Sequence, residues 1–247
     1  MRKVKTKYQT AAGKTAKSTK YSVTAKDLQP FSEKYLIDLY HKAISNETKQ
    51  EKIGWYQDAR QYAQSLADDF NITLRQAVDV IAALSPLREW ELNKKMAKIA
   101  VSAWRSGVNP LPKVHMYKKN STKAYAILNN TKYKLGIKTE TFAANIMGDY
   151  SRVTVDTVTV MTSFRLGMYP GTFTLTDSAY RFVECMFQKA AKVLGIFPAH
   201  LQAVLWEFVR IFRAKNTSEI YNNFWESATS LLGLVQMCEA KERLKFA

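Results

Sequence analysis

The chain has 247 residues, of which 47% are hydrophobic, so it can fold as one large domain or two small ones with a substantial core. Its formal net charge of +16 favours a polyanionic partner, and nucleic acid is the commonest polyanion for a soluble protein. No hydrophobic run approaches the roughly 18 residues that a membrane helix needs, and no hydrophobic segment follows the basic N-terminus. We therefore expect neither a membrane span nor a signal peptide.

The cysteine and histidine content argues against a metal site. Cys185 and Cys238 are the only cysteines, and two thiols cannot supply a four-thiolate zinc or iron–sulfur site. The three histidines are scattered and form no ligand pattern. We expect a cytoplasmic monomer that contains no metal and no cofactor.

The positive charge is concentrated at the start of the chain. Residues 1–26 contain eight Lys and Arg residues and no acidic residue, and they are rich in Thr, Ser, Ala and Gly without a hydrophobic period. This composition predicts a flexible basic tail that binds phosphates without sequence preference. A solubilising leader with no partner is the alternative.

Beyond the tail, hydrophobic residues recur at three- and four-residue steps, which predicts an all-α fold. Thr73 is a good N-cap for one helix, Thr176 or Asp177 for another, and Gly195 is a good helix end. The expected helices span residues 31–40, 53–66, 74–84, 90–104, 122–128, 176–194, 199–213 and 218–244, with one more opening at Lys138. Strand signals are confined to residues 152–155 and 172–175. We expect a central helical subdomain at 76–169, flanked by helical segments at 27–75 and 170–247.

Two charged residues in the central subdomain stand where a helix is expected to begin. Lys138 follows a glycine-containing turn, and Asp156 comes eighteen residues later, after the hydrophobic run that ends at Val155. A lysine and a carboxylate at such positions in a basic protein suggest chemistry on a nucleic acid. The simpler interpretations are that Asp156 is only a helix N-cap and that Lys138 is a solvated first-turn lysine.

The motifs around these two residues resemble the helix-hairpin-helix DNA glycosylase superfamily, of which endonuclease III is the familiar member. Gly136-Ile137-Lys138-Thr139 resembles the start of the hairpin's second helix, and Val155-Asp156-Thr157 resembles the motif that carries the family's catalytic aspartate. Ala83-Leu84-Ser85-Pro86 is similar to a segment that lines the DNA cleft in that family. The combination looks closer still to phage-encoded glycosylase-like proteins, which would place the protein in a host cytoplasm.

The resemblance implies two helical subdomains flanking a DNA-binding cleft, and it implies roles for particular residues. Asp156 would stabilise positive charge on the sugar, and Lys138 would attack the sugar carbon through an unprotonated amine. Candidates for the base pocket and the DNA wedge are Ser85, Leu87, Trp90 and Asn93. Candidates for phosphate binding are Lys113, Lys118, Lys119, Lys134, Gly136 and Thr139. A plain helix connector at 85–88 and a core role for Trp90 are the competing interpretations.

Three departures from the family pattern bear on the reaction. Lys134 replaces the first glycine of the hairpin, Val158 replaces the histidine after the aspartate motif, and no cysteine quartet follows. Three hypotheses therefore stay open: base excision from DNA, with or without strand cleavage, transfer of a group to a modified pyrimidine in phage DNA, and DNA binding without catalysis. DNA is the expected partner in each, with a duplex favoured over a single strand.

Overall fold

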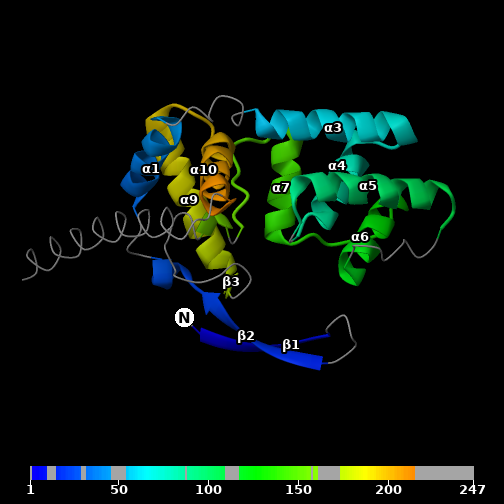
Figure 1. Ribbon diagram of the computed structural model, residues 1–247, viewed down its shortest axis with the longest axis horizontal. Coiled ribbons are helices and arrows are strands. Elements are labelled where there is room, and N and C mark those ends of the chain that lie inside the picture. Colours follow the sequence, from blue (N-terminus) through cyan, green and yellow to red (C-terminus); the bar gives the residue numbers. More distant parts are fainter. Residues whose placement is uncertain are drawn as a thin grey trace, which may run out of the picture. The chain divides into compact units, whose positions relative to one another are not determined.

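The computed structural model describes residues 2–9, 15–28, 32–45, 54–86, 88–108, 117–156, 158–160 and 173–214. These residues are mostly helical, which confirms the coarse prediction, but they also include a three-stranded sheet that the all-α prediction did not contain (Figure 1). Leu87, Lys113 and the helix expected at 218–244 lie outside the described residues.

One group of helices is built around α4 (Leu74–Leu84). The helix begins with a capping box, in which the Thr73 side chain accepts from the backbone of Gln76 and the Gln76 side chain accepts from the backbone of Thr73. Every residue from Ala77 to Leu84 is buried, so α4 presents no solvent face over that length. Four helices pack around it: α3 (Trp55–Phe70), α5 (Trp90–Arg105), α6 (Lys118–Leu128) and α7 (Ile137–Met147).

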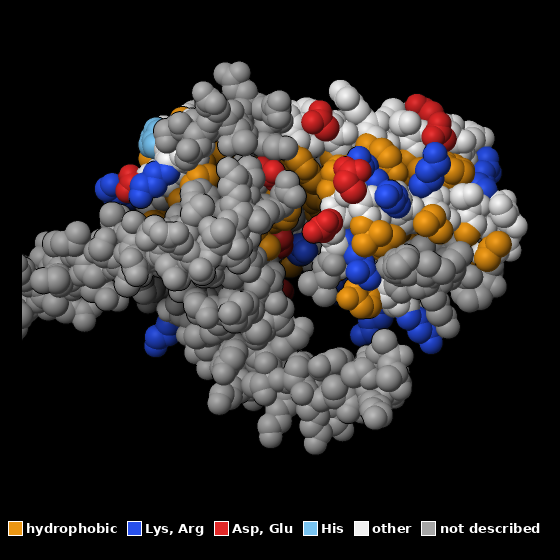
Figure 2. All heavy atoms as spheres, in the orientation of Figure 1, with side chains coloured by type: hydrophobic (Ala, Val, Ile, Leu, Met, Phe, Trp, Pro, Cys, Tyr) orange, Lys and Arg blue, Asp and Glu red, His pale blue; other side chains and the backbone are white. Residues whose placement is uncertain are grey.

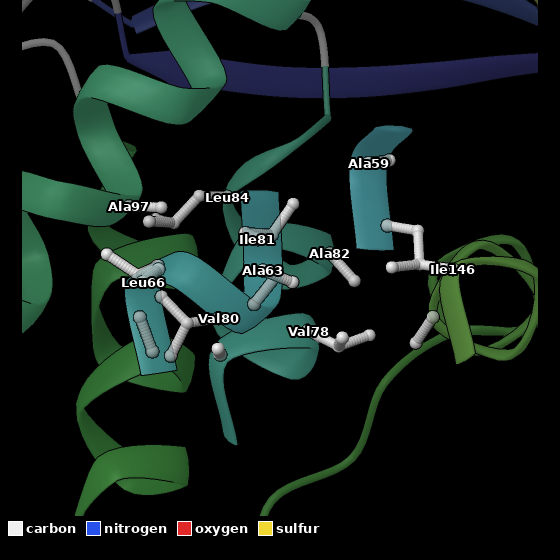
Figure 3. Close-up of a cluster of buried hydrophobic side chains, with 14 of the residues drawn as sticks. Ala59, Ala63, Leu66, Val78, Val80, Ile81, Ala82, Leu84, Ala97 and Ile146 are labelled. Carbon is white, nitrogen blue, oxygen red and sulfur yellow. The ribbon is translucent and has the colours of Figure 1, made fainter. Parts of the chain in front are cut away.

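The core of this group is made largely of small residues. Figure 3 shows Ala59 and Ala63 of α3 close to α4, with Ala97 of α5 and Ile146 of α7 completing the cluster. Alanines at these positions let the helices approach closely, because a methyl side chain takes up little space between two helix axes. In the sequence-based division α3 was placed with the terminal segments, whereas the structure packs it on α4 and α7.

A second group of elements contains η1 (Ala25–Leu28), α1 (Glu33–Ser45) and α9 (Asp177–Leu194), and α10 (Pro198–Ala214) follows α9 along the chain. Thr176 caps α9 by accepting from the backbone N–H of Ala179, and Gly195 ends it with a φ of 67°. Gly195 had been predicted as the helix end, and Thr176 as one of two candidate N-caps. α1 and η1 both pack on α9.

The segment expected to be a flexible tail contains two strands instead. β1 (Arg2–Gln9) pairs antiparallel with β2 (Thr15–Val23), and β2 pairs in parallel with β3 (Phe173–Leu175), where a strand signal had been noted. Thr, Val and Tyr at alternate positions of the segment favour strands. Their pattern is too polar to register as a hydrophobic alternation, which is why the sequence did not reveal the pairing.

Candidate active site

The candidate site is centred on residues 152–156, a segment that ends at Asp156 and is called the clamped segment below. A strand was expected at 152–155, but these residues belong to neither a helix nor the sheet. Their backbone groups are instead bonded by side chains of α7 and α9, so a buried irregular segment keeps its hydrogen bonds satisfied.

Asn145 on α7 holds one side of this segment. Its side chain is completely buried, and its Nδ2 donates to the carbonyl oxygens of Asp149 (2.7 Å) and Arg152 (3.0 Å). Its Oδ1 accepts from the Thr154 hydroxyl at 2.7 Å. One amide therefore fixes three points of the chain between α7 and Asp156.

Two residues of α9 hold the other side. The Tyr180 hydroxyl donates to the carbonyl of Val153 (2.9 Å) and accepts from the N–H of Val155 (3.2 Å). Burial raises the pKa of Tyr180 to about 12, so its hydroxyl stays protonated near neutral pH. Glu184 accepts from the N–H of Val153 and from the Arg152 guanidinium, at 3.1 and 2.9 Å.

Asp156 is the last residue of the clamped segment and caps the helical turn at 158–160. Its Oδ1 accepts from the backbone N–H of Thr159 (2.6 Å) and from the Thr159 hydroxyl (2.8 Å). Gln202 of α10 donates to the Thr159 hydroxyl (3.4 Å) and accepts from Tyr56 of α3 (2.9 Å). The carboxylate of Asp156 is partly buried, and its orientation is set by contacts that reach back to α3 and α10.

Lys138 lies in the first turn of α7 and is partly buried. It is three residues before Thr141 and seven before Asn145, so the helical repeat puts all three on one face of α7. Thr141 accepts from the Arg152 guanidinium at 3.2 Å, and Asn145 binds the same segment. The structure therefore places Lys138 on the face of α7 that holds residues 152–154.

The connection between α6 and α7, residues 131–136 and called the hairpin below, presents basic residues to solvent. Lys132 and Lys134 are exposed, whereas Leu135 is buried and holds the hairpin to the core. The Tyr133 hydroxyl donates to the buried carboxylate of Asp79 at 2.6 Å, and Arg75 donates to the same carboxylate oxygen. Burial and the Asp79 charge raise the pKa of Tyr133 to about 12. The hairpin is thus anchored on α4 by a side-chain contact that the sequence did not suggest.

Among the candidate phosphate ligands, Gly136, Lys118 and Lys119 are at the surface. Gly136 precedes α7 without any side-chain cap, and a methyl group added to it would meet nothing within 4 Å. Lys118 and Lys119 are exposed in the first turn of α6, and Thr139 is partly buried in α7.

The residues proposed for the base pocket lie at the junction of α4 and α5. Ser85 ends α4, and its hydroxyl donates to the Ala82 carbonyl at 2.9 Å. Trp90 packs on Trp55 and Tyr62 of α3, with ring centroids 5.1 and 5.9 Å away. Asn93 is buried, donates to the Ile81 carbonyl at 3.2 Å, and leaves its Oδ1 without a hydrogen-bond partner among the described residues. These contacts show how Trp90 and Asn93 pack against neighbouring elements. The pocket role of the two residues stays a prediction.

On the face shown in Figure 2, Lys and Arg side chains are mixed with acidic and hydrophobic ones over α3 and α5, so the basic residues there form no unbroken patch. No helix within the described ranges has the length and hydrophobicity to cross a bilayer. In the same part of the chain, no three His, Cys, Asp or Glu residues come together as a metal site.

Fold and site together define a mostly helical protein with a lysine and a carboxylate beside one clamped segment. The chain belongs to the family of unknown function DUF7178, whose model matches residues 18–213. No curated protein and no solved structure matches it.

Proposed function

We propose that this protein acts on duplex DNA by extruding a modified or damaged base and cleaving its glycosidic bond. The observation that carries the proposal is the clamped segment at 152–156. Buried side chains of α7 and α9 bond its backbone on both sides, and it ends at Asp156. Such supporting contacts are what a catalytic group needs if it is to be held in one geometry.

Asp156 would supply the negative charge for bond cleavage. Positive charge develops on the deoxyribose as the base departs, and a fixed carboxylate nearby stabilises it. The two bonds from Thr159 to Oδ1 orient the carboxylate without removing its charge. Capping and catalysis are therefore compatible roles for this residue.

Lys138 would supply the nucleophile. Its unprotonated amine would attack C1′ of the sugar, and the base would leave with the glycosidic electron pair and take up a proton. Opening of the sugar ring would then give a Schiff base between Lys138 and the sugar. The position of Lys138 on the α7 face that holds residues 152–154 supports this assignment.

The hairpin at 131–136 would bind the DNA backbone. Lys132 and Lys134 are exposed on it, and Gly136 leaves the amide groups at the start of α7 open to a phosphate. The anchoring of Tyr133 on Asp79 would keep this surface fixed while the base is extruded, a step that costs a few kcal/mol.

The test is the release of bases from duplex DNA carrying a panel of modified and damaged bases, measured by mass spectrometry with the wild-type chain and with Asp156→Asn. Asparagine keeps the capping oxygen and removes the charge, so we expect normal folding and a loss of release on the order of 10²–10³-fold. Asp149→Asn is the matched control, because Asp149 is an exposed carboxylate in the same connection that bonds only its neighbour Ser151 in the described structure.

The proposal fails if the wild type releases no base from any member of the panel, or if Asp156→Asn releases bases as fast as the control. If the treated DNA contains an altered nucleoside and no abasic sites, the reaction is transfer of a group to the base and not excision.

A further inference from the structure

Arg75 is an exposed basic residue that a buried carboxylate holds in place. It lies in the first turn of α4 with 61% of its side chain exposed, and its Nε donates to the Asp79 carboxylate at 2.8 Å. Asp79 is one turn further along the helix and is buried. Long charged side chains at a surface usually keep their rotamer freedom, because ordering them costs conformational entropy. The Arg75 guanidinium is instead fixed by a group of the core.

This contact leaves most of the guanidinium available to another partner. Nε supplies one of the five N–H donors, and within the described ranges the two Nη groups donate to no protein atom. The terminal N–H groups of a guanidinium match two oxygens of a phosphate in spacing and direction. Arg75 is thus oriented at the surface in a form suited to bidentate phosphate binding.

The need for stability does not account for the charge of Asp79. Its Oδ2 accepts from Arg75 and from the Tyr133 hydroxyl, whereas its Oδ1 is buried and has no hydrogen-bond partner in the described part of the chain. A buried carboxylate with an unbonded oxygen is costly, and a neutral amide could accept from Tyr133 as well. The ionic hold on Arg75 is what the charge of Asp79 adds.

The same carboxylate places Arg75 beside the hairpin. Tyr133, which bonds it, has an exposed lysine on either side in the sequence. A second contact joins the start of α4 to this connection, because Gln76 donates to the side chain of Asn130 at 3.3 Å. Three positive charges therefore stand around a single buried negative one.

We propose that Arg75, held by Asp79, binds a backbone phosphate of duplex DNA and extends the DNA-binding surface of the hairpin onto the start of α4. Asp79 is then a positioning residue, because it acts through Arg75 and does not touch the DNA. The inference rests on the proposed function for its partner, duplex DNA, but it requires no chemistry at Asp156 or Lys138.

A double-mutant cycle in the full chain tests this assignment. Its members are Arg75→Gln, Asp79→Asn and the combination of the two, with Arg181→Gln as the matched control, because Arg181 is an exposed arginine on α9 in the other group of helices. Affinity for a short unmodified duplex is measured by fluorescence anisotropy over a series of salt concentrations. Thermal unfolding checks that each variant is folded.

We expect Arg75→Gln to bind the duplex about tenfold more weakly and to reduce the salt dependence of binding by about 0.9, the value for one lost phosphate contact. Asp79→Asn removes a negative charge, which by long-range electrostatics alone would strengthen DNA binding. A positioning role predicts the opposite sign, and only while Arg75 is present. The combination should therefore bind no more weakly than Arg75→Gln, and Arg181→Gln should bind as the wild type does.

Arg75→Lys covers the case in which Arg75→Gln does not fold, since glutamine leaves the buried carboxylate without its cation. Lysine keeps the ion pair with Asp79 but is a point charge that cannot offer two parallel N–H groups. We expect it to bind the duplex more weakly than the wild type with the salt dependence unchanged. Binding by Arg75→Lys at wild-type affinity would contradict the bidentate contact.

Wild-type affinity of Arg75→Gln, or an equal loss in Arg181→Gln, would overturn the inference. It would also be overturned if Asp79→Asn weakened binding equally with and without Arg75, since the carboxylate would then only support the hairpin. A loss of binding to phosphatidylserine vesicles without a loss on the duplex would assign Arg75 to a lipid headgroup instead. Because the duplex is unmodified, a protein that releases no base can still pass this test, so failure of the proposed chemistry is distinguishable from failure here.

Discussion

At the scale of single residues, two glycines beside the candidate site are constrained in opposite ways. Gly148 ends α7 with a φ of 105°, a conformation that other residues adopt only with strain. Gly136 has a φ of −83° and a ψ of 161°, which any residue can adopt, and open space where a side chain would be. The fold therefore explains Gly148 but not Gly136.

Alanine at each glycine should separate these two roles. Gly136→Ala should raise the free energy of unfolding by about 0.4–1 kcal/mol, because it restricts the unfolded chain without native strain. It should also weaken DNA binding, since a methyl group would lie where a phosphate approaches the start of α7. Urea unfolding and duplex titration measure the two effects.

Gly148→Ala is the control for this experiment, and it should lower the free energy of unfolding by roughly 1–2 kcal/mol through left-handed backbone strain. If Gly136→Ala binds duplex DNA as tightly as the wild type, the hairpin is not the phosphate-binding surface.

The sequence indicated which residues belong to the site only where those residues are part of a short local motif. Asp156 and Lys138 stand in recognisable short patterns, whereas Tyr180 and Glu184 are some thirty residues from the backbone groups they bond. Gln202 stands among the hydrophobic residues of α10, and it bonds both Tyr56 and Thr159. Contacts of this kind depend on the tertiary arrangement, and no local pattern indicates them.

At the scale of elements, the connection from α7 to Asp156 depends on one buried amide. Asn145→Ala would remove the partner of the Asp149 and Arg152 carbonyls and of the buried Thr154 hydroxyl, and an unsatisfied buried group costs about 1–3 kcal/mol. We expect a loss of stability of that order or more, measured by urea unfolding.

Asn129→Ala is a suitable comparison, because Asn129 is exposed and water can replace its hydrogen bonds. Its effect should stay within about 0.5 kcal/mol. Equal effects of the two substitutions would mean that Asn145 does not hold the connection.

The ends of several helices were predictable because a capping residue lies next to its helix in the sequence. Thr73 begins α4 and Gly195 ends α9 at the positions expected from the sequence, and α5 ends within one residue of its predicted end. The start of α6 was missed by one turn, since Lys118 to Ser121 carry no hydrophobic period. The β1–β2 ribbon was missed altogether, because its Lys- and Thr-rich strands are too polar to show a hydrophobic alternation.

At the scale of the whole molecule, the uneven charge is the property that most needs an explanation. Half of the net charge of +16 is carried by residues 1–26, which contain eight basic residues and no acid. The remaining basic residues include exposed lysines on the hairpin before α7 and at the start of α6. The exposed lysines at these two places fit the contact with a DNA backbone that we propose.

The most direct measurement is trapping of a covalent protein–DNA adduct with sodium borohydride on duplexes that carry modified bases. A Schiff base between Lys138 and the sugar would be reduced to a stable adduct that migrates slowly on a denaturing gel. We predict an adduct with the wild type and with Lys134→Gln, which removes an exposed lysine of the same hairpin, and none with Lys138→Gln. An adduct that persists in Lys138→Gln, or the absence of any adduct with the wild type across the substrate panel, would contradict the assignment of Lys138 as the nucleophile.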